Sequence, residues 1–287
     1  MRKRKHRYNI NGIILCGLAI FVIGATAFCK VVDSHEAERR EERIEAQKEK
    51  EREQAKAAAE KKRAEDSSVQ PGVPVGTLEP AADKKIVYLT FDDGPSEYTE
   101  QILEILREND VKGTFFITGA KEKYRPLIKE AYDAGHTIGL HTYSHDYSSV
   151  YSSENAYFED LEKIAGVAEE QLGFVPCFIR FPGGSSNRVS EKYSKGIMTD
   201  LAAKVQEEGY QYYDWNVDSG DGANCSKDEI IANSVTDRYQ NIMILFHDTK
   251  PQTVEALPQI IQSYKDSGYE FRPIDRAGFV SQHKIFN

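Results

Sequence analysis

From residue 84 onward, the chain alternates short apolar segments with longer segments whose apolar residues recur at helical spacing. Strands that alternate with helices form a mainly parallel sheet with the helices packed outside it, so the sequence predicts an α/β fold. About six or seven such units favour a barrel over an open sheet. The expected strands cover residues 86–91, 114–117, 136–140, 177–181, 211–217 and 242–246. The expected helices follow Ser96, cover 122–134, run from Ser152 or Ser153 to Gly173, cover 199–208, begin at Lys227 and end near Lys265.

Polar and ionisable residues lie within or directly after the carboxyl-terminal part of five of the expected strands. In parallel α/β sheets, chemistry gathers at the carboxyl ends of the strands, so these residues are the candidates for a site. They are Asp92-Asp93, His141 to His145, Arg180 to Gly184, Asp214-Trp215 and His247-Asp248.

Two histidines and a carboxylate among these residues predict a metal site. His141 and His145 can converge if their segment bends, and with one aspartate they make the three-ligand set of a catalytic zinc. Adjacent side chains on a strand point to opposite sides, so one of Asp92 and Asp93 can bind metal while the other stays free as a base. Histidines four apart are weak evidence alone, and His136 is interpreted as structural.

The remaining strand-end residues suit hydrolysis of an acyl group. Water beside a metal ion has its pKa lowered toward ~7, and Asp92 is placed to take its proton. His247 is the natural proton donor, with Asp214 accepting from its other ring nitrogen. Arg180 would keep Asp92 ionised and oriented. The glycine-rich backbone after Pro182 can present an N–H to a developing oxyanion.

Residues 84–272 resemble the polysaccharide deacetylases, carbohydrate esterase family four, also called the NodB-homology family. The motifs that carry the resemblance are TFDDGP (90–95), HTYSH (141–145), RFPG (180–183), Asp214-Trp215 and LFH (245–247). The resemblance implies a distorted (β/α) barrel of seven or eight units. It implies the following roles: Asp92 as base, His247 as acid, Arg180 and Asp214 as their partners, Asp93, His141 and His145 as ligands of Zn²⁺ or another divalent cation such as Co²⁺, and Gly183, Trp215 and Leu245 as substrate-binding positions.

The implied activity is removal of N-acetyl groups from an amino-sugar polymer, with N-acetylglucosamine of peptidoglycan as the expected substrate. The sequence departs from the family at Gly183, where many members have an aromatic residue, and at Gln211, where some have an acidic one. The glycine predicts a flatter or wider wall beside the substrate. Two alternatives stay open: an O-acetyl esterase on xylan or another acetylated polysaccharide, and a catalytically silent wall-binding domain.

The N-terminal segment predicts export. Residues 13–29 form an uncharged apolar run behind a basic cluster, which is typical of a membrane anchor whose N-terminus stays in the cytoplasm. The catalytic domain would then be extracellular. The alternative is a secreted protein, released by cleavage at the A-x-A pattern formed by Ala25-Thr26-Ala27.

Four regions are therefore expected: 1–32 as a basic tail and transmembrane anchor, 33–66 as a charged stalk, 67–83 as a flexible linker and 84–287 as the catalytic domain. The stalk lacks the apolar repeat of a coiled coil, and a single charged helix or a disordered spacer both fit it. Residues 67–287 carry a net charge of −13, which argues against a nucleic-acid partner. A disulfide between Cys177 and Cys225 and the oligomeric state stay open.

Overall fold

The computed structural model describes residues 10–79, 84–119, 121–223 and 225–287, without the side chains of residues 10–27, 29, 31–35 and 37. The chain divides into two compact units, Met1–Lys62 and Arg63–Asn287. The helices are α1 (Ile10–Ser67), α2 (Thr99–Glu108), α3 (Pro126–Asp133), α4 (Tyr147–Val150), α5 (Glu154–Leu172), α6 (Ile197–Glu207), α7 (Lys227–Ser234) and α8 (Pro251–Asp266). The strands are β1 (Ile86–Gly94), β2 (Thr114–Thr118), β3 (Thr137–Thr142), β4 (Phe178–Ile179), β5 (Gln211–Tyr212), β6 (Val217–Asp218), β7 (Asn241–His247) and β8 (Glu270–Phe271).

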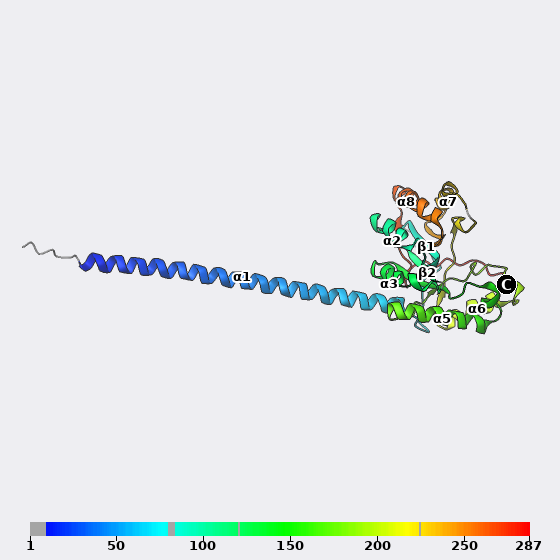
Figure 1. Ribbon diagram of the computed structural model, residues 1–287, viewed down its shortest axis with the longest axis horizontal. Coiled ribbons are helices and arrows are strands. Elements are labelled where there is room, and N and C mark those ends of the chain that lie inside the picture. The colour runs from blue at the N-terminus through cyan, green and yellow to red at the C-terminus, as the bar shows by residue number, and fades with distance from the viewer. Residues whose placement is uncertain (1–9, 80–83, 120, 224) are drawn as a thin grey trace, which may run out of the picture. The chain divides into compact units, whose positions relative to one another are not determined.

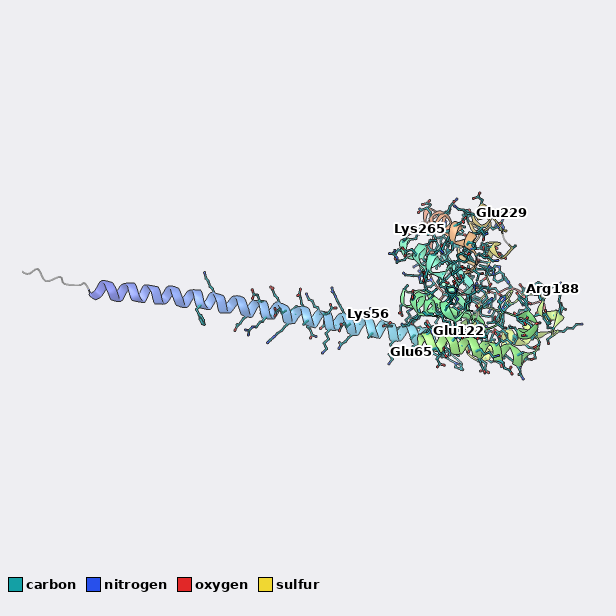
Figure 2. The ribbon with its side chains drawn as sticks, viewed as in Figure 1. Lys56, Glu65, Glu122, Arg188, Glu229 and Lys265 are labelled. Carbon is teal, nitrogen blue, oxygen red and sulfur yellow. The ribbon has the colours of Figure 1, made fainter. Side chains whose placement is uncertain are left out.

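The first unit contains helix α1 as far as Lys62, and this part of the helix has no apolar face among its described side chains. Every side chain from Glu38 to Lys62 is exposed, and side chains project both above and below the helix in Figure 2. Such a helix gains its stability from pairs of opposite charge three or four residues apart, because it buries no surface of its own. The charged segment predicted as a stalk is therefore helical in the structure.

The predicted membrane anchor is not tested by the described residues. No helix among the residues whose side chains are described is long and apolar enough to cross a membrane. The anchor predicted at residues 13–29 lies outside that set except for Phe28, as does the alternative cleavage pattern at Ala25-Thr26-Ala27.

The second unit contains a parallel sheet with strand order β5-β4-β3-β2-β1-β7-β6, and β8 also pairs with β1. The outer helices follow in the order α7, α8, α2, α3, α5, α6, each in contact with the next (Figure 1). The parallel α/β fold predicted from the alternation of apolar and helical segments is therefore confirmed. The predicted distorted barrel is present as a half-barrel, since no pairing among the described strands joins β5 to β6.

The strand expected at 211–217 is instead two short strands on opposite edges of the sheet. Three backbone bonds explain the break, because each ties the segment to a different neighbour. Tyr213 donates to Ile179 of β4, Asp214 donates to Ser281 near the C-terminus, and Asn216 donates to Met243 of β7. The segment therefore crosses the open side of the half-barrel, where no continuous ladder can form.

Two apolar clusters lie on the two faces of β1, as its alternating side chains require. Leu89 and Phe91 face the outer helices, whereas Ile86 and Tyr88 belong to a smaller inner cluster. Asp92 continues the inner series at the carboxyl end of the strand. This alternation places the polar strand-end residues next to the smaller apolar cluster on the inner face of the half-barrel.

The folded domain begins earlier than the predicted boundary at Lys84. Arg63 donates to the carbonyls of Tyr132 (2.8 Å) and His136 (2.6 Å), and the Val69 N–H donates to Val175 O (3.0 Å). Val75 is buried in the inner cluster. The segment expected to be a flexible linker is therefore held on the domain as far as Thr77, whose N–H donates to Gly278 O and whose carbonyl accepts from the Val280 N–H.

Candidate metal and acyl-transfer site

The carboxyl end of β1 separates its two aspartates. The pairing of β1 with β2 shifts register between Asp92 and Gly94, and Asp93 has a φ of 70°, in the left-handed region. A bulge of this kind re-aims one side chain relative to its neighbour. Asp92 is 3% exposed on the inner face, and Asp93 is directed toward the two histidines.

The three predicted metal ligands come together. Asp93 Oδ1 lies 3.6 Å from His141 Nε2 and 3.5 Å from His145 Nε2, and one ligand atom from each residue lies within 4.8 Å of the others. Asp93 Oδ1 is buried and accepts no hydrogen bond from the described residues. An unsatisfied buried oxygen is costly, and a cation held by these three groups would satisfy it. The residues present therefore fit a divalent metal ion.

The orientation of His141 is fixed from behind. Its Nδ1 lies 2.6 Å from the carbonyl oxygen of Arg180, so Nδ1 carries the proton and donates. The lone pair of Nε2 then faces Asp93. Burial also lowers the pKa of His141, which favours the neutral form that binds metal.

The loop between the two histidines is held by Asp160, which we did not predict. Its carboxylate accepts from the backbone N–H of Tyr143 (2.5 Å) and of Ser144 (3.1 Å), and it is 7% exposed. These bonds fix the bend that brings His141 and His145 together, with His145 at a φ of 52°. The available sequence signal was an acidic residue on the buried face of the expected helix 153–173.

Arg180 lies beside Asp92, as predicted, and is fully buried. Its guanidinium donates to Asp92 Oδ1 (2.9 Å) and Thr90 Oγ1 (2.7 Å). Two further bonds reach the carbonyls of Tyr213 (2.9 Å) and Asp214 (3.0 Å). These bonds fix the position of Arg180, and its guanidinium is always charged. Asp92 is therefore held in one orientation by a permanent cation.

The predicted pairing of His247 with Asp214 is wrong. His247 Nδ1 lies 2.7 Å from Asp221 Oδ1, and the His247 backbone N–H donates to Asp221 Oδ2 (2.6 Å). Burial alone would lower the pKa of His247, but the hydrogen bond and charge of Asp221 raise that pKa to about 9. The sequence signal that was missed is the turn Ser219-Gly220-Asp221-Gly222, directly after β6.

Asp214 is fully buried and is used for structure instead. Its carboxylate accepts from the Ser185 N–H (2.8 Å), the Ser185 hydroxyl (2.5 Å) and the His283 N–H (2.7 Å). Because Asp214 lies in the segment that crosses the open side of the half-barrel, its side chain reaches the loop after β4 and the C-terminal segment rather than β7. It ties these two segments together.

The three predicted substrate-binding residues border the same end of the sheet. Gly183 has a φ of 74° in the loop after Arg180. The ring of Trp215 packs edge-on against His283, with 4.9 Å between centroids. Leu245 precedes His247 on the inner side of β7 and is 6% exposed. The oxyanion N–H expected after Pro182 and the substrate-binding roles expected of Gly183, Trp215 and Leu245 stay predictions.

The arrangement has the parts of a hydrolytic acid–base site. Strands β1 and β7 are neighbours, and Asp92 is the register partner of His247. A carboxylate outside the three-ligand cluster therefore lies beside a histidine that stays protonated at neutral pH. Together with the metal ligands, these groups can activate water on one side of an acyl carbon and protonate a leaving group on the other.

Comparisons with known proteins agree with this geometry. The profile of the family described as "Polysaccharide deacetylase" matches residues 79–199. A peptidoglycan-N-acetylglucosamine deacetylase of Bacillus cereus is 30% identical over 271 residues, covering 90% of this chain and 89% of that protein. The solved catalytic domain of peptidoglycan N-acetylglucosamine deacetylase from Eubacterium rectale is 40% identical with a TM-score of 0.71, covering 76% of this chain and 100% of that one.

A second solved structure widens the range of similar proteins. The Xyl-CE4 domain of a multidomain xylanase from the hindgut metagenome of Trinervitermes trinervoides is 26% identical with a TM-score of 0.54. The match covers 67% of this chain and 88% of that domain.

Proposed function

The chain belongs to the polysaccharide deacetylase family, and from this premise we propose that it removes N-acetyl groups from N-acetylglucosamine of peptidoglycan. It is a hydrolase of the deacetylase type. The observation that carries the proposal is the convergence of Asp93, His141 and His145 beside a separate buried carboxylate, Asp92. The choice of peptidoglycan is supported by the names of two relatives that cover 90% and 76% of this chain.

Asp93, His141 and His145 would hold the metal ion, which we propose to be Zn²⁺, with Co²⁺ as a working substitute. When bound, such an ion polarises the acetyl carbonyl and lowers the pKa of water in the site. The ligand set is one carboxylate and two imidazoles, which suits these borderline cations better than Mg²⁺ or Ca²⁺.

The chain's own residues supply the proton transfers. Asp92, oriented by Arg180, takes the proton from the attacking water. The N–H of Gly183 stabilises the negative charge that develops on the carbonyl oxygen. His247, kept protonated by Asp221, gives its proton to the leaving amine of the sugar as the C–N bond breaks. Acetate and a free amine are the products.

We also propose that the protein acts outside the cell membrane. Residues 13–29 would serve as an anchor with a cytoplasmic N-terminus, and the charged part of α1 as a stalk of about 50 Å. The alternative is release after cleavage at Ala25-Thr26-Ala27. Membrane fractionation of cells that express a C-terminally tagged chain distinguishes the two, because only the anchored form sediments with membranes and resists extraction by carbonate.

The proposed activity is tested by acetate release from purified peptidoglycan and from N-acetylglucosamine oligomers, with Zn²⁺ and with chelator. We expect release by the protein and its loss with chelator. Asp92→Asn should lower kcat by about 10²–10⁴-fold while retaining metal. A metal-loaded protein that releases no acetate from these polymers would overturn the proposal and would favour a silent wall-binding domain.

O-acetyl esterase activity is the second candidate, and the similarity to the xylanase-associated domain favours testing it. The same site can hydrolyse an ester, because an alkoxide leaving group needs no more protonation or charge stabilisation than an amine. Acetyl-xylan assayed beside N-acetylglucosamine oligomers compares the two bonds directly. A kcat/KM higher for acetyl-xylan would replace the N-deacetylase assignment.

A further inference from the structure

A tyrosine that the catalytic scheme does not use lies against the metal ligands. Tyr147 is the first residue of α4, two positions after His145. Its ring packs edge-on against the His145 imidazole, with 5.6 Å between centroids, and against Tyr151 at 5.7 Å. The N-cap of this helix is fixed, since Asp146 accepts from the Ser148 N–H at 3.0 Å. The ring is therefore held between a metal ligand and a buried aromatic residue.

The hydroxyl of Tyr147 lies beside Gly183. A Cβ placed on Gly183 would lie 2.6 Å from Tyr147 Oη and 3.4 Å from Tyr147 Cε1. The phenol thus fills the space in which a side chain at position 183 would begin. The backbone of Gly183 and the Tyr147 ring of α4 therefore lie side by side.

This hydroxyl is not used by the fold. Tyr147 Oη has no hydrogen-bond partner among the described residues, and it is absent from the buried unsatisfied atoms, so it is open to solvent. Its neighbour Tyr151 contrasts with it, because Tyr151 is fully buried and donates to Pro182 O at 2.8 Å. A rigid ring with an unused donor beside a catalytic centre is a typical ligand contact.

We propose that Tyr147 is a substrate-binding residue that contacts the sugar whose acetyl group enters the site. Its ring packs against the C–H face of the pyranose, and its hydroxyl donates to a hydroxyl oxygen of the same sugar. The inference rests on the proposed deacetylase function for the identity of the sugar. The contact forms equally in the ground state and the transition state, so it sets KM rather than kcat.

The test compares Tyr147→Phe with the unaltered full-length chain on an N-acetylglucosamine tetramer. Loss of one neutral hydrogen bond should raise KM about three- to tenfold and leave kcat within about twofold. Tyr147→Leu, which also removes the ring, should raise KM further. The matched control is Tyr239→Phe, which removes the hydroxyl of an exposed tyrosine before the opposite end of β7 and should change neither constant. Bound metal, measured by atomic absorption, should be equal in all four proteins.

A binding measurement separates this inference from the proposed function. Calorimetric titration of the tetramer into Asp92→Asn, with and without Tyr147→Phe, should show a three- to tenfold weaker Kd in the double variant. Failure of the unaltered chain to release acetate would overturn the proposed function and leave this comparison valid. Equal Kd values, or binding by neither protein, would overturn the role of Tyr147.

Discussion

The carboxylate of Asp221 contacts His247 at both its ring and its backbone. Oδ1 lies 2.7 Å from His247 Nδ1, and Oδ2 accepts from the His247 N–H at 2.6 Å and from the Thr253 hydroxyl at 2.6 Å. Burial would raise the pKa of Asp221, but these bonds to His247 and Thr253 hold that pKa below its ordinary value. The pair therefore stays an ion pair over the neutral range, with the ring fixed and its Nε2–H left to donate.

Replacing Asp221 with Asn should move the alkaline limb of activity to lower pH. The pKa of His247 is raised to about 9, so its proton is available below that pH and is lost above it. Without the carboxylate, burial dominates and the pKa should fall to or below the ordinary value of about 6.5. The pH profile of kcat/KM measures the shift, with Asp228→Asn on the exposed first turn of α7 as control. An unchanged alkaline limb would contradict the assignment of His247 as the acid.

The same pair should make stability depend on pH. Because the folded pKa of His247 lies above the unfolded value, its contribution is complete below about pH 6.5 and is lost as pH rises through about 9. Urea unfolding at pH 6 and pH 10 should therefore show a larger loss of stability in the unaltered protein than in Asp221→Asn. Equal losses in the two proteins would show that the pair is not coupled to folding.

Replacing Asp160 with Asn should weaken metal binding with little effect on the fold. The NH₂ group of the new asparagine would lie against the N–H of Tyr143 or Ser144, and two donors cannot form a hydrogen bond. The bend between the histidines therefore loses one of its restraints. Loss of a group that orients metal ligands typically costs about 10–100-fold in affinity. Competition with a coloured zinc chelator gives the affinity, and Glu159→Gln on the exposed face of α5 is the control. Equal affinity in Asp160→Asn and Glu159→Gln would show that Asp160 does not position the ligands.

Gly183 and Tyr147 should be coupled energetically. In Gly183→Ala, the new methyl group lies 2.6 Å from the Tyr147 hydroxyl. The alanine must also adopt a φ of 74°, which costs about 1–2 kcal/mol by itself. In the Tyr147→Phe background the hydroxyl contact is gone, and the backbone cost remains together with the looser contacts to Asn187 Cβ at 3.3 Å and the ring Cε1 at 3.4 Å. A double-mutant cycle on thermal stability should give a coupling of about 1 kcal/mol. Additive effects would mean that the phenol moves away freely.

The segment before Lys84 should contribute to the stability of the catalytic domain. A chain beginning at Lys84 lacks the buried Val75 and leaves Arg276 without its acceptors at Asp66 and Ser68. Burying a valine side chain is worth about 1.5–3 kcal/mol, and each 1 kcal/mol shifts Tm by about 2–4 °C in a domain of this size. We expect a Tm lower by roughly 5–10 °C than in a chain beginning at Arg63, measured by calorimetry. Equal Tm values would restore the boundary at Lys84.

The parts of the site that the sequence predicted share one property, which is that they follow strands. Asp92, Asp93, His141 and Arg180 each lie at or just after the carboxyl end of a predicted strand, and a parallel sheet gathers those ends at one edge. His247 was found in the same way. Where strand assignment was correct, the side chains did converge.

The error in the partner of His247 lies where one strand was predicted and the chain instead crosses from one sheet edge to the other. Residues 211–217 read as a single strand carrying Asp214, and that continuous strand does not exist. The residue that does follow a strand there is Asp221, after β6. Asp160 was missed for another reason: an acid on a helix shows its role only once the loop that it contacts is known.

Local sequence determined the parallel α/β fold, the candidate set of metal ligands and the candidate base, because strand periodicity and the direction of parallel strands are enough to bring those groups together. Tertiary structure alone decided which carboxylate holds His247, how the histidine loop is bent, and that Tyr147 lies where a side chain at position 183 would be. Those contacts join residues far apart in the chain through loops that follow no repeat, so no local pattern encodes them.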